Sequence, residues 1–123
     1  MKIRSRHEGD RTIVQVSGDV DMESLERFRR VLLRQVEGDA ILLVLDAADL
    51  RRIFSGGLAV LVDVMSRLRR QGRSLWILNP SQQMRHVLAL TRLESLIPVI
   101  DADERSESIM EAGSVTMGVP SLN

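Results

Sequence analysis

The sequence predicts a single α/β domain, with a mostly parallel sheet of four or five strands and helices packed mainly on one face. Short apolar runs alternate along the chain with amphipathic stretches of helical period, which is typical of strands alternating with helices. The chain has 123 residues, enough for one hydrophobic core and too few for two. Its 44% hydrophobic and 28% charged residues are the balance of a soluble globular protein.

The first third of the chain predicts two strands and a helix. The β-branched run from Ile13 to Val16 follows a turn at residues 8–10, so two short strands are expected around that turn. A helix follows, because apolar residues then recur at helical spacing: Leu25, Phe28, Leu32 and Val36. Asp21 is placed to cap this helix, and Gly38 follows its end.

The middle of the chain predicts a buried strand and a second helix. The run "AILLVLDA" is apolar throughout and too short for a helix, so it indicates a strand buried on both faces. The next helix is expected to start near Gly57 and to end at Gly72. Its inward-facing residues are expected to be Leu58, Leu61, Met65 and Leu68.

The remaining elements repeat this alternation. "SLWILN" predicts another buried strand, and the helix after Pro80 should turn one side inward: Met84, Val87, Leu88 and Thr91. "IPVI" predicts a short strand, "DERSESIMEA" a weaker last helix, and residues 113–123 a loose tail after a domain at 1–112. The segments Ile41–Leu45 and Leu75–Leu78 should be central and buried.

Composition excludes several classes of function. Lys+Arg and Asp+Glu both number 17, so no overall field favours nucleic acid or a membrane surface. Cysteine is absent, which excludes disulfides and thiolate chemistry and disfavours a zinc site. The start of the chain lacks an apolar signal segment, and no apolar run approaches the ~20 residues needed to span a bilayer. We therefore expect a cytoplasmic protein without membrane insertion.

No enzyme motif emerges from the sequence. His7 and His86 have no acid or nucleophile spaced to form a catalytic triad, and neither nucleotide-binding glycine motif occurs. Asp19 and Asp21 suggest a cation site, but a helix cap with a solvated neighbour is the favoured interpretation. The arginine run "RLRRQGR" favours a helix C-terminus over a nucleic-acid patch. We expect no catalytic residue, no metal and no cofactor.

The junction Phe54–Gly57 lies between a predicted buried strand and a predicted helix. In a parallel sheet with right-handed crossovers, such junctions share the edge where α/β proteins keep their sites. The amides of Gly56, Gly57 and Leu58 should point out of the helix N-terminus, where a partner's carboxylate is favoured. Phe54 is expected to be exposed there. Partner contact and a plain chain turn remain as two interpretations of almost equal weight.

The order and spacing of these segments resemble the STAS domain family, whose best-known members are bacterial anti-sigma factor antagonists. The resemblance covers roughly residues 12–112. It includes "VSGDVD", "LLVLDAADLRRIFSGGLAVLV" and "GRSLWILNPSQQMRHVLALTRLESLIPV". It implies a STAS-like domain over 1–112 that binds an anti-sigma factor or a kinase-like regulator, as a monomer or weak homodimer.

The resemblance also implies a missing phosphoacceptor. In the family this loop usually reads Asp-Ser-Ser-Gly, and the second serine is phosphorylated by a partner that is both kinase and anti-sigma factor. Aligned on Leu58, Phe54 stands at the aspartate, Ser55 at the first serine and Gly56 at the phosphorylated serine, while Gly57 is kept. The hydroxyl of Ser55 remains a weaker candidate for modification.

The partner-binding residues expected from these considerations span two segments: Asp21, Phe54, Ser55, Gly56, Gly57 and Leu58. The leading hypothesis is an interaction module of the anti-sigma factor antagonist type that lacks the usual switch. The alternative is a STAS subunit that supports the ATPase of a lipid-transport ABC complex. A small-ligand or nucleotide binder is the third class, which saturable nucleotide binding would reveal.

Overall fold

The computed structural model describes residues 1–102, so the predicted last helix and tail lie outside the described residues. The elements follow one another in this order: β1 (Lys2–Glu8), β2 (Arg11–Val20), α1 (Leu25–Val36), β3 (Leu42–Asp46), β4 (Leu50–Ile53), α2 (Ser55–Arg70), β5 (Ser74–Leu78), α3 (Gln82–Leu90), the 3₁₀ turn η1 (Leu93–Ser95) and β6 (Val99–Ile100).

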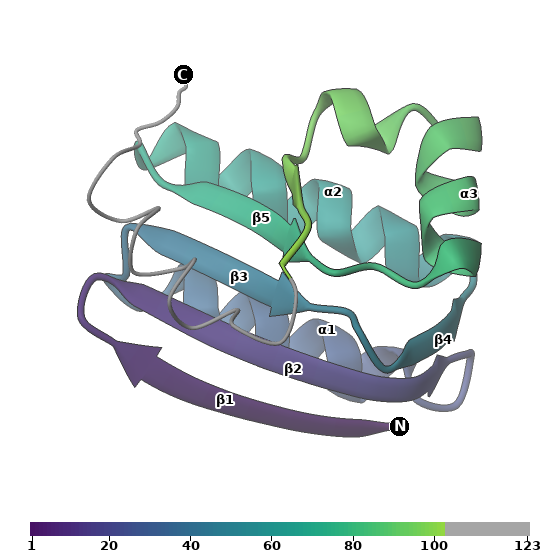
Figure 1. The fold of residues 1–123 in the computed structure, drawn as a ribbon. Helices are drawn as coiled ribbons and strands as arrows, with labels where there is room; N and C mark the ends of the chain where they lie inside the picture. Colours follow the sequence, from purple (N-terminus) through teal and green to yellow (C-terminus); the bar gives the residue numbers. More distant parts are fainter. Residues whose placement is uncertain (103–123) are drawn as a thin grey trace.

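One mixed sheet forms the centre of the molecule (Figure 1). Its strands lie in the order β1-β2-β3-β5-β6, and β4 also pairs with β2. Among the strands of residues 1–102, only the β1–β2 hairpin is antiparallel; every other pairing is parallel. The predicted fold class is confirmed, and the described residues contribute six strands to the sheet, one more than the upper expectation.

The two apolar runs form the central strands, as predicted. β3 lies between β2 and β5, and its residues Leu43, Val44 and Leu45 are buried. Ile41 was wrongly included in that strand. It precedes β3, its amide donates to the carbonyl of Asp10, and 58% of it is exposed.

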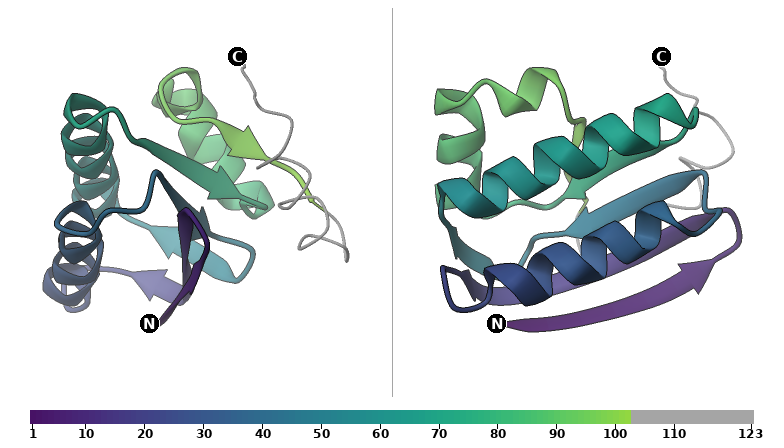
Figure 2. Two further views of the ribbon diagram at one scale, coloured as in Figure 1. Left: turned by 90° about the vertical axis from the view of Figure 1, so that its left-hand side faces the viewer. Right: turned by 180° about the vertical axis from the view of Figure 1, so that it is seen from behind.

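Helices α1 and α2 lie side by side on one face of the sheet, whereas α3 stands apart at the end near β4 (Figure 2). The side chains packed between the helices and the sheet form the main core, whose largest fully buried members include Phe28, Leu32, Leu43, Leu45, Leu61, Leu68, Leu75 and Ile77. In the described part of the chain, no helix is both long enough and apolar enough to cross a membrane.

Strand β4 was not predicted, because its sequence Leu-Arg-Arg-Ile lacks the apolar pattern of the other strands. It pairs in parallel with the second half of β2, beyond a bulge between Gly18 and Asp19. Gly18 has φ +88°, a conformation that residues with a Cβ atom rarely adopt. The bulge therefore lets β2 leave β3 and continue beside β4.

Two helix boundaries also differ from the prediction. α2 begins at Ser55, with Phe54 as its N-cap, rather than near Gly57. Thr91 does not face inward; it is the exposed C-cap residue of α3, and its hydroxyl donates to the carbonyl of Val87 at 2.8 Å. A threonine hydroxyl satisfies a helix-end carbonyl without burial, which a periodic pattern does not reveal.

Candidate functional site

The ends of β2 and β4 and the starts of α1, α2 and α3 meet at one end of the sheet (Figure 1). Hydrogen bonds to backbone carbonyls connect these elements. The amide of Phe54 donates to the carbonyl of Val20 at 3.2 Å, which ties the start of α2 to β2. The hydroxyl of Ser81, the N-cap of α3, donates to the carbonyl of Leu50 in β4 at 3.2 Å. We call this region the site edge.

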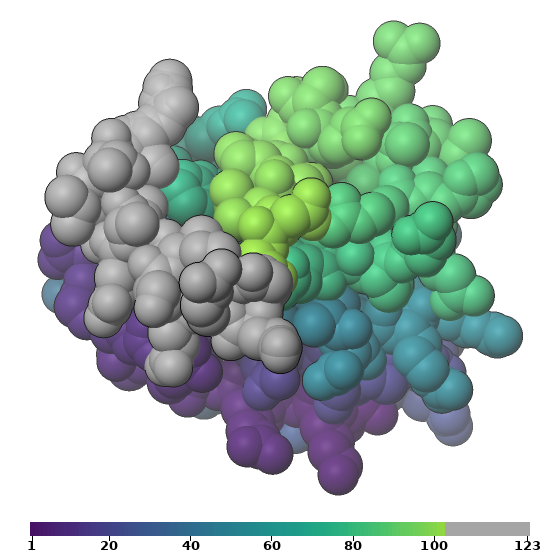
Figure 3. Space-filling view, viewed as in Figure 1, coloured from purple at the N-terminus to yellow at the C-terminus, as the bar shows by residue number. Residues whose placement is uncertain are grey.

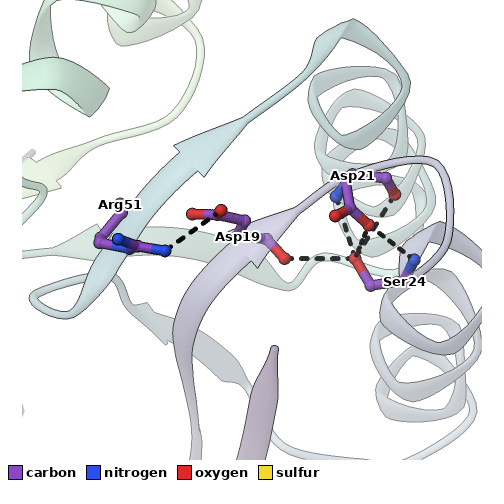
Figure 4. A network of polar contacts seen from close by, with 4 residues as sticks. All are labelled: Asp19, Asp21, Ser24 and Arg51. Carbon is purple, nitrogen blue, oxygen red and sulfur yellow. Dashed lines mark hydrogen bonds and ion pairs between the residues drawn. The ribbon is translucent and has the colours of Figure 1, made fainter.

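Asp21 and Ser24 form a reciprocal pair in the turn before α1 (Figure 4). Oδ1 of Asp21 accepts from the Ser24 amide at 3.0 Å, and the Asp21 amide donates to Oγ of Ser24 at 2.9 Å. The N-cap of the helix is thus Ser24, and Asp21 caps the turn that precedes it. The Ser24 amide and hydroxyl lower the pKa of Asp21.

Asp19 and Asp21, whose spacing suggested a cation site, have separate partners. Oδ2 of Asp19 accepts from Nη2 of Arg51 at 3.2 Å (Figure 4), while Asp21 is held by Ser24. Among the described residues, no three acidic, histidine or cysteine side chains gather to hold a metal ion. The sequence favoured a helix cap beside a solvated neighbour; in the structure Ser24 rather than Asp21 is the N-cap of α1, and Asp19 is paired with Arg51.

The ring of Phe54 folds back over Gly56. A Cβ atom built on Gly56 would lie 2.5 Å from Cζ of Phe54 and 2.9 Å from Cε2, distances that real Cβ atoms essentially never show. Phe54 is half-buried by this arrangement, rather than projecting freely from the edge as expected. The ring thus fills the space that a side chain at position 56 would need.

Gly57 and Leu58 face the interior. Gly57 is buried, and a Cβ atom on it would lie 2.6 Å from Cγ1 of Ile53 and 3.0 Å from Cγ1 of Val20. Leu58 is half-buried and packs against the main core. Both residues hold the start of α2 against β2 and β4, so they shape the site edge from beneath.

The amides at the start of α2 are only partly open. Those of Gly57 and Leu58 both donate to the carbonyl of Phe54, at 2.9 and 3.2 Å, which corrects the expectation that they point outward. Phe54 provides no side-chain cap for the first turn, and that turn carries no acidic residue. Ser55 is exposed as the first residue of the helix.

A groove of about 510 Å³ lies beside Phe54, between the ends of β2 and β4 and the start of α3. Asp21 and Phe54 both line it, so the structure brings together these two predicted residues from distant parts of the chain. In the space-filling view the green surface of α3 meets the blue-green surface of the β4 segment on the right of the molecule (Figure 3).

The STAS domain model matches residues 2–106 of the sequence. The chain belongs to the STAS domain family. The match extends from β1 to just beyond the described residues, so it includes every element that forms the site edge. This confirms the resemblance that the motifs indicated. No curated protein sequence is a detectable match.

Solved structures with the same fold include anti-sigma factor antagonists. The unphosphorylated form of the anti-sigma factor antagonist SpoIIAA has a TM-score of 0.77 and 19% identity over 94% of this STAS domain chain and 99% of that one. An anti-sigma factor antagonist from Mycobacterium paratuberculosis also scores 0.77, at 18% identity over 88% and 92% of the two chains. A sulfate transporter family protein from Wolinella succinogenes scores 0.72, at 15% identity over 89% and 91%.

Several residues of the site edge were not predicted from the sequence. Met22 follows Asp21 in the loop after β2 and is 81% exposed, which is unusual for an apolar side chain. Gln83 and Val87 enter the groove from α3, a helix more than twenty residues further along the chain. The sequence could have indicated Met22, because it is an apolar residue within a polar turn. Gln83 and Val87 approach Phe54 only in the tertiary fold, so the sequence did not indicate them.

Proposed function

We propose that this STAS domain is a non-enzymatic regulator of the anti-sigma factor antagonist type. In this proposal the site edge binds an anti-sigma factor or a related kinase-like regulator, and the predicted contact residues from Asp21 to Leu58 form or support the surface. The observation that supports it is the contact between the Phe54 ring and the space above Gly56, because the ring fills the position at which the family resemblance expects a phosphorylated serine.

The physical consequence of glycine at position 56 is a site edge that phosphorylation does not switch. A phosphate on a serine there would add about −1.5 to −2 charge to the contact surface and oppose the partner. Gly56 has no hydroxyl to accept it, and the Phe54 ring occupies the adjacent space. The binding-competent state is then always present. The amount of complex is regulated instead by the concentration of the protein or of its partner.

Ser55 is the remaining candidate acceptor in the loop. Its side chain is exposed at the first position of α2, one residue before the position that the family modifies. A kinase whose active site positions a hydroxyl at residue 56 would contact the Phe54 ring there instead of a hydroxyl group. We expect no phosphate on residues 54–57 when the protein is incubated with its kinase-like partner and ATP; stoichiometric phosphate on Ser55 by mass spectrometry would overturn this.

Affinity purification from the native cell, followed by mass spectrometry of the captured proteins, identifies the partner. The partner is then purified and its affinity measured for wild type, Gly56→Asp and Gly56→Ala. Both variants displace the Phe54 ring, but only the aspartate adds charge. An unpaired charge buried at an interface costs ~2–5 kcal/mol, so Gly56→Asp should bind at least ~30-fold more weakly, with a much smaller loss for Gly56→Ala.

Binding of Gly56→Asp within about threefold of wild type, with its cooperative unfolding intact, would show that the partner does not contact this loop. The glycines would then be a chain turn without a role in recognition.

A second candidate is a STAS subunit beside a membrane transporter, such as the ATPase of a lipid-transport ABC complex. The similarity of this fold to that of a sulfate transporter family protein supports this second candidate. The same affinity purification discriminates the two candidates, because capture of a transporter ATPase supports the second and capture of an anti-sigma factor or kinase-like protein supports the first.

A further inference from the structure

The groove beside Phe54 is apolar at its base. Five apolar side chains line it: Val20, Ile53, Phe54, Met84 and Val87. Met84 is only 2% exposed, so the base is part of the packed protein rather than a loose surface. A space of about 510 Å³ is large enough for one or two side chains of another protein.

The charged side chains that line the groove differ in whether they have a partner. Two aspartates and two arginines line it. Asp19 pairs with Arg51, and Asp21 is held by the Ser24 amide and hydroxyl at the start of α1. Arg52 is exposed and forms no ion pair within residues 1–102. Within residues 1–102, Arg52 thus lacks an ion-pair partner, while Asp19 and Asp21 line the same groove and Oδ1 of Asp19 is buried without a hydrogen-bond donor.

The helices that border the groove add positive potential. Phe54, the N-cap of α2, and Gln83, in the first turn of α3, both line it. Neither helix has an acidic residue in its first turn, where one would normally offset the dipole. Arg52 and the two helix starts therefore favour a negative group at the same rim.

We propose that this groove receives a segment of the regulatory partner in which an apolar side chain is flanked by carboxylates. The inference rests on the proposed function and specifies the chemistry of the partner. The apolar side chain enters between Phe54 and Val87, and a carboxylate pairs with Arg52. Phe54 thus has two roles: it fills the space above Gly56 and forms one wall of the groove.

Peptides test this chemistry without knowledge of the partner. Acetyl-Glu-Leu-Glu-amide and acetyl-Lys-Leu-Lys-amide are titrated in the millimolar range into the ¹⁵N-labelled full-length chain, and the amide signals are followed by NMR. The acidic peptide should shift the signals of groove residues such as Val20, Phe54 and Gln83, whereas the basic peptide should not. Added salt should weaken the response, because the ion pair with Arg52 is exposed.

Three variants sharpen the measurement. Arg52→Glu should weaken the acidic peptide at least about fivefold and create a response to the basic one. Phe54→Ala should weaken binding of the acidic peptide through loss of the apolar wall. Arg70→Glu is the matched control, because Arg70 is also exposed but lies at the C-terminal end of α2, and the substitution should leave the response unchanged.

Equal responses to the two peptides, shifts confined to residues outside the groove, or no response at all would each overturn the proposal. Its failure is distinguishable from failure of the proposed function. If the captured regulator binds wild type and Arg52→Glu equally well but loses Gly56→Asp, the function stands and the groove chemistry is wrong. If the acidic peptide binds as expected but no regulator is captured from cells, the proposed function is wrong.

Discussion

Arg73 donates from Nη1 to the carbonyl oxygen of Val36 at 2.7 Å, across a gap of 37 residues in the sequence. The same guanidinium donates to the carbonyls of Gln35 and Ala40, at 2.9 and 2.6 Å. These three carbonyls lie at and beyond the end of α1, where helix carbonyls lack partners within the helix. A buried cation therefore closes this helix end and joins it to the residue that precedes β5.

Arg73→Met should lower the free energy of unfolding by about 2–4 kcal/mol, because it removes the guanidinium donor from the buried carbonyl of Val36 and from the partly buried carbonyl of Ala40. Arg73→Lys should recover only part of this, since an ammonium cannot reproduce the planar set of guanidinium donors. Urea denaturation measures both. Arg70→Met is the control and should change stability by less than about 0.5 kcal/mol; an equally small effect at Arg73 would show that its contacts contribute little.

Gly57→Ala should destabilise the fold by about 1–3 kcal/mol, because the new Cβ meets Cγ1 of Ile53 and Cγ1 of Val20 in a packed region. Gly38→Ala is a suitable control, since a Cβ there lies 3.4 Å from the carbonyl of Gln35 and in open surroundings otherwise. Thermal unfolding of both variants should show a clear loss only for Gly57→Ala. Equal melting temperatures would mean that the start of α2 shifts freely.

Phe54 and Gly56 should be energetically coupled. Alanine is the better helix former, so Gly56→Ala should stabilise the Phe54→Ala protein by about 0.4–1 kcal/mol. In the wild-type background it must displace the ring, at about 0.5–1.5 kcal/mol. A double-mutant cycle by urea denaturation should therefore give a coupling of about 0.5–1.5 kcal/mol. Strictly additive effects would contradict the contact.

The carboxyl group of Asp21 should titrate below its ordinary pKa of 3.8, because the Ser24 amide and hydroxyl stabilise the ionised form. In Ser24→Ala, loss of the hydroxyl should raise the pKa toward that value. A depressed pKa contributes stability above about pH 4, and this contribution disappears as the pH falls through the folded-state pKa.

The stability difference between wild type and Ser24→Ala should therefore narrow in acid. NMR titration of the Asp21 carboxyl carbon measures the pKa directly. If the pKa of Asp21 is unchanged in Ser24→Ala, the hydroxyl does not contribute and the Ser24 backbone amide is the main cause of the lowered pKa.

Periodicity predicted the elements with strong apolar patterns and missed the one without. β3 and β5 are continuous apolar runs, so their central positions followed from the requirement to bury both faces. β4 has only Leu50 fully buried, and its two arginines face solvent. Its strand geometry depends on pairing with the second half of β2, which is a tertiary property that local sequence does not encode.

The site edge was predicted in position but not in detail. Parallel topology placed Asp21 and Phe54 at the same end of the sheet, and both line one groove. The orientation of the Phe54 ring could not be predicted, because it depends on the empty space above a glycine two residues away. The walls from α3 also required the three-dimensional path of the chain.

The pairing of β2 with two different strands along its length should affect how fast a partner binds. Its first half pairs with β3 and its second half with β4, so the strand that leads into α1 is hydrogen-bonded to the strand that leads into α2. A partner approaching the site edge meets backbone that is already ordered, and little conformational entropy remains to be lost on association. Encounter should then be limited by diffusion and orientation rather than by a folding step, and differences in affinity among variants should appear mainly as differences in dissociation rate.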